Sequence, residues 1–151
     1  MPDFSELFME SDGQPVEYKG RTLLMIDYFP VPKGEQRIRY RIVSTNSEWK
    51  QGIAVSTEGE LDFDEGAPLT RGWADLWEHL TTGEGEFTCR SRDGKLKTIN
   101  IWDTGDGCVE SWYYGAAMWV EEIPNGRRYH CNDGHPDDNF DDIVFELTCV
   151  D

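Results

Sequence analysis

The sequence is short of basic residues. It has 14 Lys and Arg against 30 Asp and Glu, which gives a formal net charge of -16 at pH 7 over 151 residues. So acidic a surface repels nucleic acid and anionic lipid and attracts basic proteins. We therefore expect a basic protein as the partner, with no direct binding to nucleic acid or to a membrane.

Long hydrophobic runs are missing as well. Apolar runs such as residues 23–26 are far too short to cross a bilayer. Residues 1–10 carry Asp3, Glu6 and Glu10 and no basic residue, so the positive n-region and the apolar h-region of a signal peptide are both absent. These absences predict a cytoplasmic protein.

The motifs of common enzyme classes are also absent. The chain has no G-x-x-x-x-G-K-[ST] phosphate loop, no G-x-S-x-G elbow and no H-E-x-x-H helix. It has no C-x-x-C pair, because its cysteines are widely spaced at Cys89, Cys108, Cys131 and Cys149. Spacing cannot rank their disulfide connectivities, but a cytosolic domain favours reduced thiols buried in strands. We expect neither an enzyme nor a cofactor.

The composition is sufficient for one folded domain. Hydrophobic residues make up 38% of the chain and aromatic residues 13%, which supports a core despite the charge. A chain of this length has the usual size of a single hydrophobic core. We expect one α+β domain over residues 1–151, in which an antiparallel β-meander sheet carries one amphipathic helix on one face.

Turn dipeptides divide the predicted sheet. Asp93-Gly94 separates residues 87–92 from 95–103, and this dipeptide favours a two-residue β-hairpin. Asn125-Gly126 separates residues 118–123 from 127–131 in the same way. Further strands are predicted over residues 22–29, 36–44, 52–56, 60–63, 108–114 and 143–150.

The amphipathic helix is predicted over about residues 70–81. Trp73, Leu76, Trp77 and Leu80 fall at i, i+3, i+4 and i+7, which places them on one helical face. Thr70 is a suitable N-cap for this helix. The stripe is typical of a helix packed on a sheet. A shorter helical turn is predicted over residues 4–9.

Two rows of like charge alternate with apolar residues. Arg37, Arg39 and Arg41 share one face of their predicted strand, and Glu58, Glu60, Asp62 and Asp64 share one face of another segment. If the two strands are neighbours, the rows form a cross-strand ladder worth roughly 0.2–1 kcal/mol per pair. We favour this ladder over an anion-binding site formed by the arginines.

Residues 130–142 form the densest polar stretch. As a calcium loop it fails, because Asp142 stands where an EF-hand needs glycine and Thr148 where it needs glutamate. As a zinc site it offers His130, Cys131 and His135 without a fourth ligand at a recognisable spacing. We therefore interpret it as a solvated acidic loop, with an enzyme or metal module built on those three residues as an alternative.

Carboxylate clusters and aromatic residues together suggest a protein interface. Aromatic anchors with an acidic rim are typical of tight complexes, and surface carboxylates accelerate docking of a basic partner. The candidate partner-binding residues are Asp137, Asp138, Asp141, Asp142, Glu60, Asp62 and Asp64, with Trp112 or Tyr114 as an anchor.

These features lead to a hypothesis about function. Toxins that act on nucleic acid must be basic to bind phosphates. We expect a small cytosolic inhibitor, an immunity protein of bacterial competition, that covers the active site of such a toxin. A phage-encoded anti-defence protein that imitates the charge of DNA is an alternative, and adaptation to high salt is another explanation of the acidity.

Overall fold

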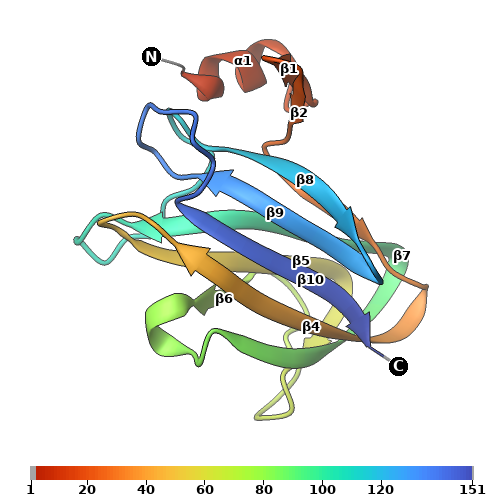
Figure 1. Cartoon of the computed structure of the whole chain (residues 1–151). Coiled ribbons are helices and arrows are strands. Elements are labelled where there is room, and N and C mark those ends of the chain that lie inside the picture. The colour runs from red at the N-terminus through yellow and green to blue at the C-terminus, as the bar shows by residue number, and fades with distance from the viewer. Residues whose placement is uncertain (1–2, 151) are drawn as a thin grey trace.

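The computed structural model describes residues 3–150 as a sheet-dominated α+β protein with one short α-helix. Figure 1 shows α1 and the small β1–β2 ribbon at one end of a large, strongly twisted sheet. In chain order the elements are α1 (Phe4–Glu10), β1 (Val16–Tyr18), β2 (Arg21–Leu23), β3 (Asp27–Pro30), β4 (Gly34–Thr45), β5 (Lys50–Asp62), β6 (Ala74–Trp77), the 3-10 turn η1 (Glu78–Leu80), β7 (Glu84–Asp103), β8 (Ala117–Ile123), β9 (Gly126–Asn132) and β10 (Ile143–Val150).

The large sheet is antiparallel and curls around its core. Its strand order is β6-β5-β7-β4-β10-β9-β8, and β3 also pairs with β7. Ile53 of β5 and Met118 of β8 belong to one buried cluster, although their strands lie toward opposite ends of this order. Curling brings the two ends of the sheet close enough to share a core.

The hairpin predicted at Asp93-Gly94 is wrong. β7 continues through the dipeptide, and β5 pairs with both halves of it, Thr57 with Leu96 and Gly59 with Ser91. Residues 92–95 form a bulge in which the Ser91 hydroxyl accepts the Gly94 amide at 3.0 Å. Gly94 has a φ of 78°, which a bulge can use as readily as a turn. Because β5 pairs with β7 on both sides of the dipeptide, the chain forms a bulge there instead of a hairpin.

The helix predicted over residues 70–81 is also wrong. Residues 74–77 are strand β6, which pairs with the edge of β5, and η1 follows it. Leu76 is buried, but Leu80 is 73% exposed and Trp73 is 42% exposed, so the residues at helical spacing share no common face. Backbone hydrogen bonding to an open sheet edge outweighed the local periodicity.

Of the other elements predicted from the sequence, the structure confirms two and changes the rest of the strands named here. The helical turn at residues 4–9 is confirmed as α1, and the reversal near Asn125 is confirmed as the β8–β9 hairpin. Residues 52–56 and 60–63 form one strand, β5, while residues 108–114 form a loop that touches the sheet through the Trp102–Glu110 bridge.

All the cysteines are free thiols, with Cys89 and Cys131 buried. None of the described helices is long and apolar enough to span a membrane.

Candidate functional site

The acidic row of β5 is already paired with arginines. β4 and β5 are not neighbours, because β7 lies between them and supplies Arg90. Arg90 contacts Glu60 at 2.9 Å and Asp62 at 3.5 Å. Arg37 of β4 reaches Asp64 at 2.6 Å, and this hydrogen bond lowers the pKa of the Asp64 carboxyl. The charge ladder therefore spans several strands rather than one pair, and Glu60, Asp62 and Asp64 each have an arginine partner.

The loop between β9 and β10 is docked on the domain rather than solvated. Asp138 accepts a hydrogen bond from Lys19 at 2.9 Å, and Asp141 accepts one from the Asn46 amide at 2.9 Å. Asp142 is only 3% exposed and accepts the backbone N–H of Asp133 at 2.9 Å. Asp137 is partly buried. Of the carboxylates predicted to meet a partner here, Asp138 is thus the one that is exposed.

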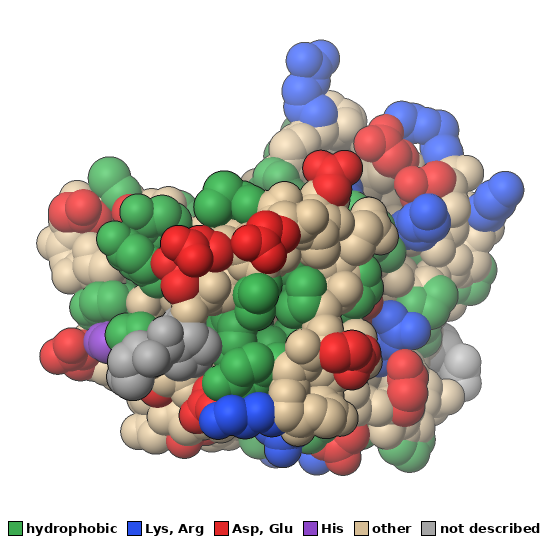
Figure 2. Space-filling model, turned by 90° about the horizontal axis from the view of Figure 1, so that it is seen from above, with side chains coloured by type: hydrophobic (Ala, Val, Ile, Leu, Met, Phe, Trp, Pro, Cys, Tyr) green, Lys and Arg blue, Asp and Glu red, His purple; other side chains and the backbone are tan. Residues whose placement is uncertain are grey.

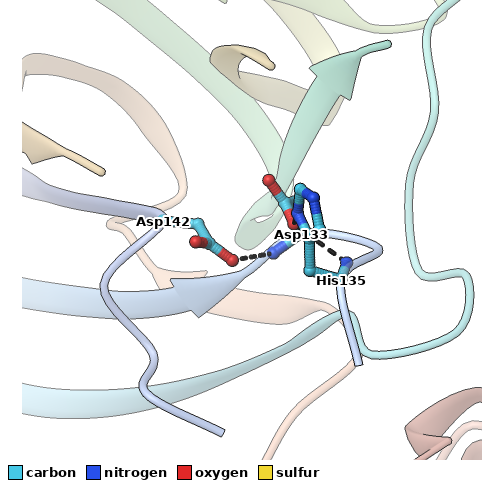
Figure 3. A group of neighbouring side chains, drawn as sticks. All are labelled: Asp133, His135 and Asp142. Atoms are coloured by element: carbon cyan, nitrogen blue, oxygen red, sulfur yellow. Dashed lines mark hydrogen bonds and ion pairs between the residues drawn. The ribbon is translucent and has the colours of Figure 1, made fainter. Parts of the chain in front are cut away.

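Asp133, His135 and Asp142 form a compact cluster at the start and end of this loop (Figure 3). Asp133 is completely buried. One of its carboxylate oxygens accepts His135 Nδ1–H at 2.7 Å and the His135 backbone N–H at 3.0 Å. The other accepts the Ser47 hydroxyl at 2.6 Å and the Gln51 amide at 3.0 Å. Both oxygens therefore have protein donors.

The cluster also perturbs protonation. Burial of the His135 ring disfavours its charge, but hydrogen bonds to Asp133 and Glu48 outweigh this and raise its pKa. The ring stacks on Trp49 with centroids 3.9 Å apart. Burial, together with the nearby Asp133 and Asp137 carboxylates, raises the pKa of Asp142 to about 7. The cluster thus holds protons that an unfolded chain would release.

A metal fits this cluster poorly. Ligand atoms of Asp133, His135 and Asp142 lie within 4.8 Å of one another. However, the Asp133 oxygens and His135 Nδ1 are engaged with each other and with protein donors. The arrangement is better suited to fastening the β9–β10 loop to residues 47–51 than to coordinating an ion.

The residues of the alternative metal module, His130, Cys131 and His135, do not come together as a set. His130 stacks on Trp119 with centroids 3.9 Å apart and bonds Glu121 at 3.0 Å, whereas Cys131 is completely buried. Within residues 3–150, the metal-ligand grouping that forms contains only His135 from the predicted set. Sequence reasoning overlooked Asp133, whose close spacing to His135 was the available signal.

An apolar hollow is the other notable feature of the surface. It has a volume of about 400 Å³ and lies over the outer face of β5 and β7. Ala54, Ile99 and Ile101 form a small buried cluster at this face, separate from the main core. Met25 also lines it, together with Trp73, Val109 and Trp112, which are all exposed. Large apolar side chains gathered in this way mark interaction sites more often than structural ones.

The loop that supplies Trp112 has an unusual backbone. Trp112 and Tyr114 have φ angles of 49° and 50°, in the left-handed region that L-residues disfavour by about 1–2 kcal/mol. They are 39% and 51% exposed. The rings of Tyr113 and Tyr114 contact each other at a tilt of 54°, with centroids 4.1 Å apart. Strain combined with exposed aromatic rings is typical of a binding loop rather than a packing element.

Acidic groups accompany the hollow. Asp75 of β6 lines it, and within the described range 3–150 its carboxylate has no side-chain hydrogen bond or ion pair. Partial desolvation raises the pKa of its carboxyl. A second hollow of about 370 Å³ shares Met25 and Trp112 with the first and continues to Met9 and Asp12. Together the two hollows form an apolar trough, whose lining includes Asp75 in the first hollow and Asp12 in the second.

The face that carries α1 also combines exposed hydrophobic side chains with acidic ones (Figure 2). In Figure 2 hydrophobic side chains gather in a hollowed region near the middle, and acidic side chains border it. Basic side chains lie at the lower border of this region and in the right-hand and upper parts of the view.

No protein-family model, no curated protein and no solved structure matches the chain. The chemistry of the surface is therefore the guide to function. It offers a cluster of hydrogen-bonded titratable groups at the β9–β10 loop and an aromatic, acidic trough elsewhere.

Proposed function

We propose that this protein is a small acidic inhibitor, an immunity protein that binds a basic toxin acting on nucleic acid and covers its active site. The observation that carries this proposal is the apolar trough, which exposes Trp73 and Trp112 beside the unpaired carboxylate of Asp75. Aromatic anchors carry most of the binding energy in tight interfaces, and acidic surroundings select a basic partner.

The acidic residues proposed from sequence have a supporting role in this function. Glu60, Asp62 and Asp64 are paired with arginines, and Asp142 is buried, so they would act mainly through the field of the whole molecule. That field comes from a formal net charge of -16 and steers a basic partner during diffusional encounter. The aromatic trough would then supply the lasting contacts.

Imitation of DNA charge, the function of the alternative phage protein, receives less support. Mimicry needs rows of unpaired carboxylates that stand in for phosphates. In the most regular acidic row, Glu60 and Asp62 contact Arg90, and Asp64 contacts Arg37. The paired row favours the aromatic interface as the recognition surface.

Capture from a lysate of the source organism tests the proposal. The immobilised protein should retain one basic protein in a one-to-one ratio at low and moderate salt. A Trp73→Ala/Trp112→Ala bait should lose that protein, while the control Leu80→Ala, which removes an exposed apolar side chain outside the lining, should keep it. The purified partner should lose its activity on nucleic acid when the wild-type protein is added.

Two results would contradict the proposal. One is the absence of a specific partner at either salt concentration. The other is undiminished capture by the double tryptophan variant, which would remove the trough from the interface.

A further inference from the structure

The first hollow combines aromatic faces with one uncompensated charge. Its lining is apolar apart from Ser111 and Asp75, and two indole rings, Trp73 and Trp112, contribute to it. The described Lys and Arg residues all lie beyond ion-pair distance of Asp75. A carboxylate beside apolar walls and indole faces is suited to a weakly hydrated organic cation.

The chain itself shows that its indoles accept such cations. The guanidinium carbon of Arg21 lies 4.4 Å from the ring centroid of Trp119. Lys97 places its ammonium 5.5 Å from the ring centroid of Trp73, yet Lys97 does not line the hollow. The space between Trp73, Trp112 and Asp75 therefore remains open to an external cation.

We propose that this hollow binds the guanidinium group of an arginine presented by a protein partner, with Asp75 as its counter-ion and the indoles of Trp73 and Trp112 as its stacking surfaces. This inference rests on the proposed function, because it names the part of the basic partner that the trough recognises. It gives the trough a chemical specificity that apolar area alone would not provide.

Arginine fits better than lysine for a geometric reason. A guanidinium is planar, stacks on aromatic rings and forms two parallel hydrogen bonds to one carboxylate. An ammonium is a compact, strongly hydrated charge and loses more hydration on entering an apolar hollow. The volume of about 400 Å³ lies within the range of roughly 300–1,000 Å³ usual for ligand sites.

A partner's side chain fits better than a free small cation. The hollow continues through Met25 and Trp112 into the second hollow, which reaches Met9 and Asp12. Tyr113 and Tyr114 stand exposed in the loop that carries Trp112. A protein segment that inserts an arginine could lie along the trough and gain contacts that an isolated cation cannot.

The test is an NMR titration with a defined probe, the peptide acetyl-Gly-Arg-Leu-Gly-amide. Its citrulline counterpart has nearly the same shape without the charge. Wild-type protein should show saturable shifts of the indole N–H signals of Trp73 and Trp112, identified with Trp→Phe variants. The citrulline peptide should bind at least about tenfold more weakly, since a charge-assisted hydrogen bond is lost.

Matched variants locate the interaction. Asp75→Asn should weaken binding of the arginine peptide about tenfold, whereas Glu65→Gln, which removes one exposed charge outside the lining, should leave the dissociation constant within twofold. Equal binding of arginine and citrulline peptides, or an unchanged affinity in Asp75→Asn, would overturn the proposal. So would binding of guanidinium chloride as tight as that of the peptide, because the site would then recognise a small cation.

The titration is independent of the capture experiment. It uses the isolated protein and a synthetic peptide, so arginine-specific shifts without any captured partner would reject the inhibitor function and retain the guanidinium site. Capture through the tryptophans without arginine-specific shifts would retain the function and reject the site.

Discussion

Replacement of Asp142 by asparagine is expected to stabilise the protein at neutral and alkaline pH. Asp142 is 3% exposed and belongs to the cluster with Asp133 and His135. Its Oδ2 accepts the Asp133 backbone N–H at 2.9 Å, and an asparagine oxygen can accept the same hydrogen bond. The substitution therefore removes the buried negative charge and keeps the structural contact.

The magnitude follows from the shifted pKa. Burial raises the pKa of the Asp142 carboxyl from 3.8 to about 7. Each unit of difference between the folded and unfolded states corresponds to about 1.4 kcal/mol, so full ionisation costs the folded state about 4 kcal/mol. The sign is that of a raised carboxyl pKa: the folded state holds a proton that the unfolded state releases, so stability falls as the pH rises from about 4 to about 7.

Urea denaturation between pH 4 and pH 8.5 measures this effect. Asp142→Asn should match wild type near pH 4 and exceed it increasingly up to about pH 7, with a constant advantage above. Glu65→Gln removes one exposed charge and should leave the pH slope unchanged. An equal stability difference at pH 4 and pH 8.5, or one below about 1 kcal/mol at pH 8.5, would refute the buried-charge reasoning.

Three further results are expected. Gly59→Ala should lower the free energy of unfolding, measured by urea titration, by about 2–4 kcal/mol, because Gly59 has a φ of 147° and a Cβ there would lie 1.8 Å from the Arg90 carbonyl oxygen. The control Gly66→Ala should lower it less, because Gly66 also has a positive φ but a Cβ there would meet no atom within 4 Å. The fluorescence of Trp49, which stacks on His135, should change with pH at a midpoint above 6.5, because hydrogen bonds to Asp133 and Glu48 raise the pKa of His135. His135→Phe should abolish that transition, and a midpoint at or below pH 6.5 would contradict the pairing with Asp133. Chelator or added zinc should leave the melting temperature unchanged, because protein donors occupy both Asp133 oxygens, and a metal-dependent shift of several degrees would show that the cluster coordinates an ion.

The alternation of exposed and buried side chains along a strand could be predicted from the sequence, because it depends on residues close together in the chain. The strand containing Arg37, Arg39 and Arg41 places them on its exposed side, and Ile38 and Tyr40 are buried on the other. Asp3 caps α1 by accepting the Glu6 amide, as an N-cap aspartate commonly does. Such features depend on periodicity and on contacts a few residues apart.

The candidate site could be predicted only in part. Trp112 and Tyr114 were identified from their aromatic character; Trp112 lines the trough, and Tyr114 is exposed in the same loop. Trp73 was assigned to a helix face, and Asp75 was not singled out, because β6 and its position against the outer face of β5 have no local signal. The hollow exists only once β5, β7 and two loops have come together.

The sequence by itself determined the strong negative charge, the dominance of β-strands and the short first helix, because composition and residue spacing fix these locally. Tertiary structure decided that residues 84–103 form one bulged strand, that residues 74–77 extend the edge of the sheet, and that Asp142 is buried. Each of these outcomes depends on which distant strand satisfies a backbone edge and which side chains are thereby covered. Local patterns cannot specify that choice, because competing partners lie tens of residues away along the chain.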